Sequence, residues 1–340
     1  MSAPAPATID VHAHCIPVGV METLVAEGGR WGVEITERDD GKRGALIAGR
    51  VKAGPLVPGL VDLPRRLAAM DASGVDVQLI SSWIDFTAYA LDDAAGARYS
   101  RMFNEGLAAT VAEAPHRFRA LATVPLQSPE RAVAELLHAV TELGMVGVEI
   151  ATTVDGRELD DPALEPFWAV AEELRALVVL HPCQSLKGRD LSRYGLGNLI
   201  GNPAESTLAL GFLIFGGVLE RHPDLRICVV HGGGFAPYQI GRWDRGFSTA
   251  ARGATEHLTR SPGDWLRHLY FDTVLHSAQS LRFLIDVVGS DHVLLGSDYP
   301  FIMGEPEPVK LLGDVSGLTE GDRDLILQGT LARLLADVGT

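Results

Sequence analysis

Short, nearly continuous apolar runs alternate along the chain with longer stretches that carry apolar residues at helical spacing. Apolar runs without polar alternation are typical of strands covered on both faces, as in a parallel sheet. The runs that we expect to form strands are 8–12, 75–81, 118–124, 146–151, 177–181, 226–231, 269–273 and 293–297.

Between most of these strands, apolar residues recur three or four positions apart, which predicts helices with one buried face. The predicted helices are 63–72, 94–114, 129–143, 162–176, 204–222 and 277–288. This alternation indicates repeated β/α units of the α/β class. Eight strands favour a closed (β/α)8 TIM barrel, and because no interdomain linker is visible, we expect a single domain over residues 1–340.

Two connections are much longer than the roughly 2–6 residues usual between such elements. Residues 15–61, rich in glycine and charge, separate the first strand from its helix, and residues 182–203 follow the fifth strand. Insertions at the carboxyl end of a barrel strand usually shape or cover a site. We therefore expect the 15–61 insertion near the mouth of an active site.

The charge composition argues against some classes of binding partner. The 29 Lys and Arg residues against 44 Asp and Glu residues give a formal charge of −15, without a basic run, which argues against nucleic acid. No apolar stretch is long enough for a membrane span, and no secretion signal is visible. Three cysteines without paired spacing favour a reducing, cytoplasmic location. An anionic substrate would need local positive charge, from a metal or a placed arginine.

The sharpest local signal is His12-Ala13-His14 at the end of the first predicted strand. Residues two apart in a strand point to the same face, so both imidazoles can reach one ion. Taken alone, the pair is equally compatible with a hydrogen-bonded or surface pair.

Three other predicted strands also end on a polar residue: His181, His231 and Asp298. Each one alone is more simply a buried, hydrogen-bonded histidine or a helix cap. Their coincidence favours a common site, because the carboxyl ends of barrel strands face one opening where active sites lie.

These residues carry a family resemblance. His12-Ala13-His14, His181-Pro182, the segment from His231 to Gly234 (HGGG) and the segment 296–301 (GSDYPF) resemble the amidohydrolase superfamily, in particular the aminocarboxymuconate-semialdehyde decarboxylase branch. The resemblance runs in order over nearly the whole chain. It implies a metal-dependent, non-oxidative decarboxylase on a (β/α)8 barrel that needs no organic cofactor.

The resemblance also implies roles. His12, His14, His181 and Asp298 would bind one divalent metal, most simply Zn²⁺, with Mn²⁺ or Co²⁺ as alternatives, and His231 would be the catalytic acid/base. Three neutral imidazoles and one carboxylate leave Zn²⁺ with a net charge near +1 and an open position, which suits catalysis. No lysine ends the fourth strand, where binuclear relatives carry one, so a single metal is favoured.

Other residues matter to the substrate. Arg242 resembles a family arginine that reaches across a dimer interface to a substrate carboxylate, which implies a homodimer, although a solvated helix arginine is the plain alternative. His276 also matches a family position, as substrate-binding or structural. Glu205 fits the family too, as a helix-start or buried hydrogen-bonding residue.

The glycines after His231 fit either a phosphate cradle or a close backbone approach, and the resemblance favours close approach. The sequence departs from the family elsewhere. No basic residue of the insertion, among them Arg43, Arg50 and Lys52, aligns with the family's substrate-binding arginine. Cys183 stands where the family has tryptophan after His-Pro, and a pocket tryptophan is replaced near Asn198.

We therefore expect a small aromatic or unsaturated carboxylic acid as substrate, such as a hydroxybenzoate. A hydrolase of the same superfamily, acting on a lactone, amide or related carbonyl, is the alternative activity. A third possibility is a barrel that binds metal or a partner chain without catalysis.

Overall fold

The computed structural model describes residues 7–183 and 190–340. Across these residues, eight strands pair side by side in parallel in one sheet. They are β1 (Ile9–His14), β5 (Val77–Ser81), β6 (Phe118–Ala122), β7 (Gly147–Ala151), β8 (Leu177–His181), β9 (Arg226–Val229), β10 (Tyr270–Asp272) and β11 (Val293–Leu294).

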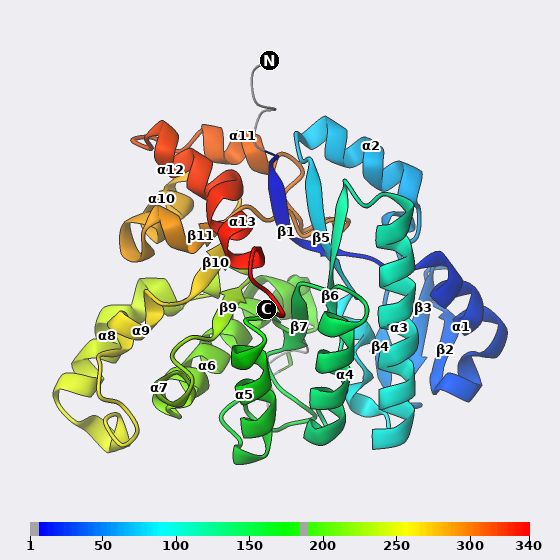
Figure 1. Cartoon of the computed structure of the whole chain (residues 1–340), viewed down its shortest axis with the longest axis horizontal. Coiled ribbons are helices and arrows are strands. Elements are labelled where there is room, and N and C mark those ends of the chain that lie inside the picture. The colour runs from blue at the N-terminus through cyan, green and yellow to red at the C-terminus, as the bar shows by residue number, and fades with distance from the viewer. Residues whose placement is uncertain (1–6, 184–189) are drawn as a thin grey trace.

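The two ends of this sheet meet. The Val11 amide donates to the Leu295 carbonyl at 2.9 Å, and the Asp298 amide donates to the His12 carbonyl at 2.8 Å, so β1 lies beside the segment that follows β11. The predicted (β/α)8 barrel is confirmed, with helices around the strands (Figure 1).

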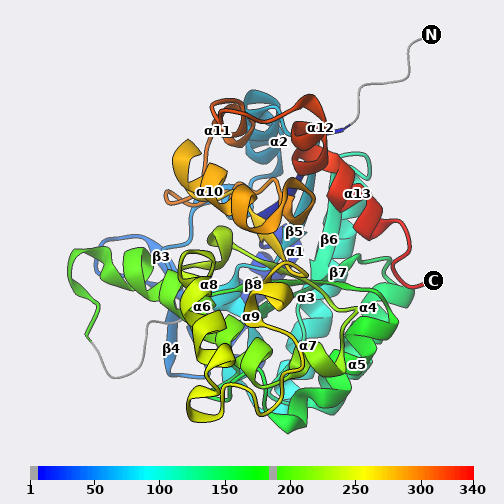
Figure 2. The same cartoon turned by 90° about the vertical axis from the view of Figure 1, so that its left-hand side faces the viewer.

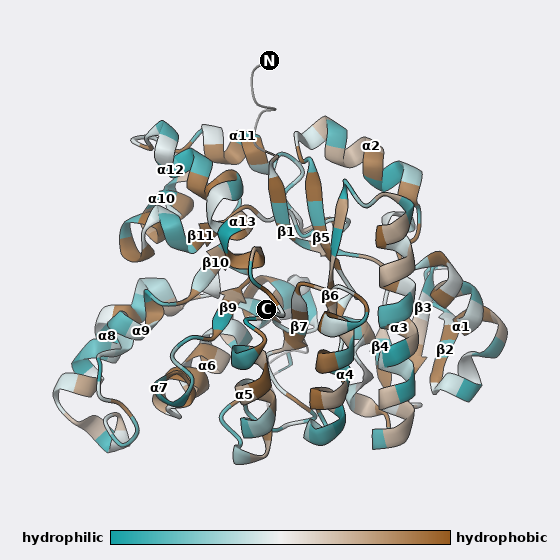
Figure 3. Ribbon diagram, in the orientation of Figure 1, coloured by the Kyte–Doolittle hydropathy of each residue, from teal (hydrophilic) through white to brown (hydrophobic). Residues whose placement is uncertain are grey.

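The helices surround the sheet and carry both hydrophobic and hydrophilic residues, as α4 and α5 show in Figure 3. Their bounds are α1 (Val18–Trp31), α2 (Leu63–Ser73), α3 (Asp93–Glu113), α4 (Pro129–Thr141), α5 (Glu165–Glu173), α6 (Asn202–Phe215), α7 (Val218–Arg221), α8 (Ala236–Ser248), α9 (Pro262–Leu266), α10 (Ala278–Val288), α11 (Pro308–Gly313), α12 (Glu320–Asp324) and α13 (Thr330–Leu335). Among these described elements, no helix is long and apolar enough to cross a membrane.

The helix predicted at 204–222 is interrupted. It forms α6 and α7, which are separated at Gly216 and Gly217, and Gly217 has a φ of 73° that a helix cannot accommodate. The predicted helix ranges also lacked α8, α9 and the helices after β11. α9 and α11 are only five or six residues long, so helical spacing has too few positions to show. α12 and α13 are joined by the π-helical turn Leu325–Gly329 into one helical stretch over 320–335.

The apolar runs of the strands are explained by burial on both faces. In β8, Leu177 and Val179 pack inside the barrel, whereas Val178 and Leu180 pack outward in the core beneath the helices. Leu331 of α13 joins the interior cluster. The interior is therefore a packed core rather than a pore, and His181 continues the inward alternation of Leu177 and Val179 at the end of the strand.

The 15–61 insertion is more ordered than a long loop. It contains α1 and a three-stranded antiparallel sheet of β2 (Val33–Glu37), β3 (Arg43–Ile47) and β4 (Val51–Ala53). Figure 1 shows these elements outside the barrel, beside α3. Figure 2 shows β3 and β4 on the same side of the molecule as the segment that leads into α6.

The three glycines after His231 lie where the backbone is crowded, as expected for close approach. All three have positive φ, and a Cβ at Gly234 would lie 2.0 Å from the Pro203 carbonyl oxygen at the start of α6. A Cβ at Gly233 would lie 2.6 Å from the Phe271 ring of β10. The glycines therefore let this turn pack against α6 and β10.

We expect Gly234→Ala to lower the free energy of unfolding by about 2–4 kcal/mol, because it adds a steric clash to an unfavourable φ. Gly211→Ala is the matched control, because Gly211 lies within α6 and a Cβ there meets nothing within 4 Å. This control should be neutral or stabilising by up to about 1 kcal/mol. Urea unfolding of both variants measures the difference, and equal stabilities would contradict the close-approach explanation.

Candidate active site

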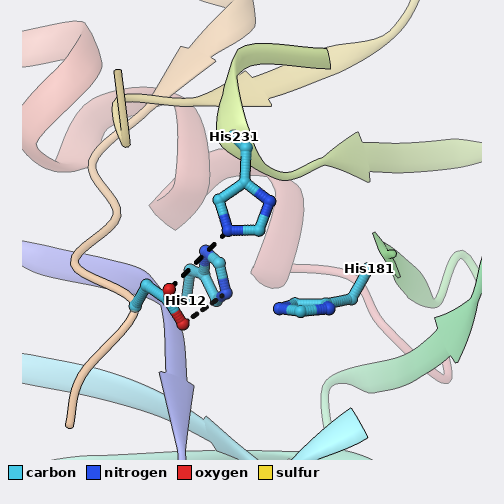
Figure 4. Close-up of side chains that lie close together, drawn as sticks. His12, His181 and His231 are labelled. Atoms are coloured by element: carbon cyan, nitrogen blue, oxygen red, sulfur yellow. Dashed lines mark ion pairs between the residues drawn. The ribbon is translucent and has the colours of Figure 1, made fainter. Parts of the chain in front are cut away.

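Polar side chains from four strand ends meet at the carboxyl end of the barrel. His12, His181, His231 and Asp298 each place one potential ligand atom within 4.8 Å of the others. The three labelled imidazoles in Figure 4 point toward one another. His14 belongs to the same group, because its Nε2 lies 3.1 Å from the His12 Nε2 and 3.2 Å from the Asp298 Oδ1. The structure thus brings together all five residues that the sequence analysis placed at this centre.

Hydrogen bonds on the far side of three rings fix their orientation. The His12 Nδ1 lies 2.7 Å from the Asp272 Oδ2, and the His181 Nδ1 lies 2.8 Å from the Pro182 carbonyl oxygen. The His14 Nδ1 lies 3.3 Å from the Ser82 carbonyl oxygen. Because these acceptors hold a proton on Nδ1, the neutral form of each ring presents the lone pair of its Nε2 to the centre.

Several buried atoms at the centre lack a hydrogen-bond partner among the described residues. They are the His181 Nε2, the His231 Nδ1 and the Asp298 Oδ1. Buried polar atoms without partners are costly, and lone pairs of nitrogen and oxygen repel one another. A divalent cation would satisfy the His181 and Asp298 atoms together with the facing nitrogens of His12 and His14. The donor set therefore fits a metal.

The electrostatics of the centre reflect this concentration of lone pairs. Burial opposes protonation of His12, but the carboxylates of Asp298 and Asp272 outweigh it and raise its pKa to about 9. Burial, together with His14 and His12, lowers the pKa of His181 well below its usual value. The neighbouring histidines hold the pKa of Asp298 far below its usual range, even though burial opposes this. Asp298 is therefore ionised and His181 is neutral, which are the forms that bind a cation.

The backbone is strained where two of these residues leave their strands. His231 and Asp298 have φ angles of 55° and 57°, in the left-handed region that side chains other than glycine rarely adopt. Such strain persists only where surrounding structure enforces it, and it concentrates at functional sites. At both positions the turn aims the side chain back over the barrel mouth.

The sequence analysis missed the residues that support the ligand set. Asp272 on β10 holds His12, and its other oxygen accepts from the Gly232 amide at 3.0 Å. Glu149 on β7 is buried, accepts from the Ser81 hydroxyl at 2.8 Å and lies 3.8 Å from the His14 Nδ1. Burial raises the pKa of this carboxyl. The available signal was a carboxylate inside each of two apolar strands, where packing alone does not explain it.

Arg66 of α2 is a second unforeseen support. Its buried guanidinium donates to the carbonyls of His14 and Gly59 and, at 3.1 Å, to the Gln78 side chain. It also lies over the Tyr299 ring, 4.7 Å from the ring centre. Arg66 thus ties the first strand to the loop that carries Asp298.

A cavity of about 630 Å³ opens next to the metal-binding cluster. His181, His231 and Asp298 contribute to its wall, together with residues of the insertion. Trp83 and Phe301 form an aromatic part of the lining, and the Phe301 ring centre lies 5.4 Å from that of His14 and 5.1 Å from that of Trp83. The space suits a small planar molecule beside the cluster.

The residues predicted to bind substrate are placed differently. Arg242 is exposed on α8 and is not part of the cavity wall within this chain. His276 also lies outside the wall, with its Nδ1 3.4 Å from the Glu305 Oε2, so contact with a substrate in this cavity is not seen. Like His231 and Asp298, it has a positive φ, of 54°.

Basic residues of the insertion do reach the cavity. Arg50 and Lys52, which the sequence analysis named without a role, are in its wall together with Lys42, whereas Arg43 is not. The Arg50 guanidinium donates to the Asp155 carboxylate at 3.0 Å. Glu205, by contrast, is buried in the first turn of α6.

The geometry agrees with the comparison with known families. The sequence pattern of the amidohydrolase family matches residues 9–336. The chain belongs to the amidohydrolase family. This amidohydrolase is 31% identical over 328 residues to 2-amino-3-carboxymuconate-6-semialdehyde decarboxylase of Dictyostelium discoideum, an alignment that covers 96% of this chain and 91% of the relative.

Two further relatives extend the comparison. Gamma-resorcylate decarboxylase of Rhizobium sp. (strain MTP-10005) is 31% identical over 255 residues, 69% of this chain and 76% of the relative. The crystal structure of 5-carboxyvanillate decarboxylase from Sphingomonas paucimobilis superposes with a TM-score of 0.81 at 25% identity and covers 97% of this chain and 99% of its own. The family resemblance stated from the sequence is confirmed.

The raised pKa of His12 predicts pH-dependent metal uptake. Metal must displace the proton that His12 holds in the metal-free protein at pH 7, so affinity should rise on the order of tenfold between pH 7 and pH 8 and level off above about pH 9. Calorimetry in buffers of different ionisation enthalpy measures the affinity and the proton release. Asp272→Asn removes one carboxylate that favours protonation of His12. In this variant the metal affinity should therefore level off at a lower pH. Affinity that does not vary over this range would contradict the assignment.

Proposed function

We propose that this amidohydrolase is a metal-dependent, non-oxidative decarboxylase of a small aromatic or unsaturated carboxylic acid. The observation that carries the proposal is the cluster of His12, His14, His181, His231 and Asp298 beside an aromatic-walled cavity. The named relatives are decarboxylases, which confirms the class of reaction predicted from the sequence. The departures near Cys183 and Asn198, both in the cavity wall, leave the individual substrate to be found by assay.

We propose that His12, His14, His181 and Asp298 hold one divalent metal, with Zn²⁺ as the first expectation and Mn²⁺ or Co²⁺ as alternatives. Three imidazole nitrogens and one carboxylate oxygen are ligands that suit these ions. When bound, the ion supplies the positive charge that attracts the substrate's carboxylate. This local charge offsets the repulsion that the chain's formal charge of −15 exerts on an acid.

His231 is assigned as the proton donor. Its ring contributes to the cavity wall, and its Nε2 lies 3.7 Å from the Asp298 Oδ2. The protonated imidazole transfers its proton to the substrate carbon that carries the carboxylate. The bond to the carboxyl carbon then breaks, its electrons return to the unsaturated system, and CO₂ leaves. The ring carbon gains hydrogen where it lost CO₂, so no oxidant or reductant is needed.

Replacement of His231 separates this role from metal binding. In His231→Asn, CO₂ release should fall by about 10²–10⁴-fold, while the metal content stays near one ion per chain. His14→Asn is the matched comparison, because it should lose metal as well as activity.

The assay compares CO₂ release with incorporation of labelled water for aromatic and dienoic acids, lactones and amides. Hydrolysis without CO₂ would replace the proposal with the alternative hydrolase. If His231→Asn loses the metal and His14→Asn retains it, His231 rather than His14 is the fourth ligand.

We further propose a homodimer in which α8 takes part. Tyr238 of α8 is 74% exposed and contacts the exposed Phe283 of α10 in a tilted arrangement, with ring centres 5.8 Å apart. Exposed aromatic pairs of this kind are characteristic of protein interfaces. Arg242 follows Tyr238 by four residues and therefore lies on the same face of α8, where it would reach a partner subunit rather than its own cavity.

The dimer is tested by separating assembly from substrate binding. Tyr238→Glu should convert the protein to monomer in light scattering and reduce activity. Arg242→Ala should leave the dimer intact and raise KM for the acid about 10–100-fold, because a charged hydrogen bond is lost. An active protein that is strictly monomeric would contradict both the dimer interface at α8 and the proposed role of Arg242 in substrate binding.

The cysteines support a reducing, cytoplasmic location, which we also propose. Cys15, Cys183 and Cys228 are all free and buried. Burial raises the pKa of each thiol, so none is activated as a nucleophile.

A further inference from the structure

One carboxylate in the cavity wall has no role in the cluster described above. Asp85 lies in the short helical turn η2 (Ile84–Phe86) that follows β5, and it forms part of the cavity wall. Among the described residues its carboxylate has an electrostatic interaction with His14 but no hydrogen bond or ion pair. The other acids of the wall are engaged, since Asp298 belongs to the metal-binding cluster and Asp155 accepts from Arg50.

Asp85 lies beside the part of the cavity that suits a planar ring. Trp83, two residues earlier, stacks on Phe86 with ring centres 5.6 Å apart and faces Phe301, which in turn contacts His14. An unsaturated acid whose carboxylate is held at the cluster would place its ring along this aromatic wall. A substituent on that ring would meet the segment 83–89 that carries Asp85.

A second polar group of the same segment is poorly satisfied. The Tyr89 hydroxyl is buried, with the residue only 6% exposed; it interacts with the Ala151 backbone but forms no hydrogen bond of good geometry with the described residues. Tyr89 is part of the cavity wall as well. A buried hydroxyl without a partner is costly in free energy, and a ligand group can supply the missing bond.

The pKa of Asp85 is that of a carboxyl group without an ion-pair partner among the described residues. Burial raises its pKa to about 6, and the opposing effect of His14 is too small to cancel the desolvation. At neutral pH the carboxyl is still mainly ionised and can only accept hydrogen bonds. The wall thus presents an acceptor that no donor among residues 7–183 and 190–340 satisfies.

We infer that Asp85, assisted by Tyr89, determines specificity by accepting a hydrogen bond from a hydroxyl or amino group on the substrate's ring. The inference rests on the proposed function, since it assumes a carboxylate at the metal-binding cluster and a ring along Trp83 and Phe301. A neutral donor group satisfies the ionised acceptor, whereas a second carboxylate at the same ring position is repelled by it. A site built around a half-buried acceptor also discriminates against an analogue that lacks the donor.

The test measures binding of benzoate and its three monohydroxy isomers to the metal-loaded protein by calorimetry. We expect one of the 3- or 4-hydroxy isomers to bind at least tenfold more tightly than benzoate, on the scale of a charged hydrogen bond. In Asp85→Leu the ratio of the affinities for that isomer and for benzoate should fall to about one. The affinity for benzoate itself should stay within about threefold of its value in the parent protein. Asp85→Asn, which keeps an acceptor oxygen, should restore part of the preference, and Tyr89→Phe should weaken it.

Asp155→Asn is the matched control, because it removes a carboxylate of the same cavity wall that is already paired with Arg50. It should leave the isomer preference unchanged. Equal weakening of all four ligands in Asp85→Leu would indicate a merely structural role and overturn the inference, as would a parent protein without isomer preference.

The binding assay and the CO₂ assay fail independently. If the isomer preference depends on Asp85 but no acid releases CO₂, the proposed reaction is wrong and the recognition of the donor group stands. If CO₂ is released and the preference survives Asp85→Leu, the inference alone is wrong.

Discussion

The structure depends on a set of nitrogen and oxygen lone pairs that are brought together in a buried place, where a proton or a metal cation must lie between them. The facing Nε2 atoms of His12 and His14, 3.1 Å apart, show this most directly. Asp298 adds a carboxylate oxygen at 3.2 Å from one of these nitrogens and 3.4 Å from the other. An assembly of this kind is unfavourable by itself, because it combines desolvation with electrostatic repulsion. It persists because the ends of four barrel strands position these residues, with His12 and His14 both on β1.

A surrounding network holds these residues in place. Asp272 fixes one face of His12, and the buried Arg66 binds the backbone of His14 and lies over Tyr299. Beneath them, Asp10 accepts from the Ser297 hydroxyl at 2.6 Å and from the Gln78 amide at 2.9 Å. The network links β1 and β5 with the loop after β11. Its members contact no part of the cavity, yet they determine where the lone pairs point.

The cavity next to the cluster has a distinct chemistry in each part of its wall. At the inner end lies the histidine and aspartate cluster, and Trp83 and Phe301 provide an aromatic side. Asp85 adds an acceptor without a partner among the described residues, and Lys52 with other basic residues of the insertion adds positive charge. Such separation orients an amphiphilic acid, because its carboxylate, ring and substituents each prefer a different part of the wall. Specificity in this fold therefore resides in the loops, while the strands provide the reactive centre.

Local patterns in the sequence were sufficient for the barrel and for the five residues of its centre. The apolar runs follow from strands buried on both faces, and His181, His231 and Asp298 were visible because a polar residue at the tip of such a run is poorly explained by packing. Contacts between distant segments were not accessible in this way. That Asp272 faces His12, that Arg66 supports His14 and that Asp85 lies beside an aromatic wall depend on which surfaces meet when the sheet closes. Hydrophobic periodicity reports whether a position is buried, but not which side chain lies opposite, and only the closed barrel determines the latter.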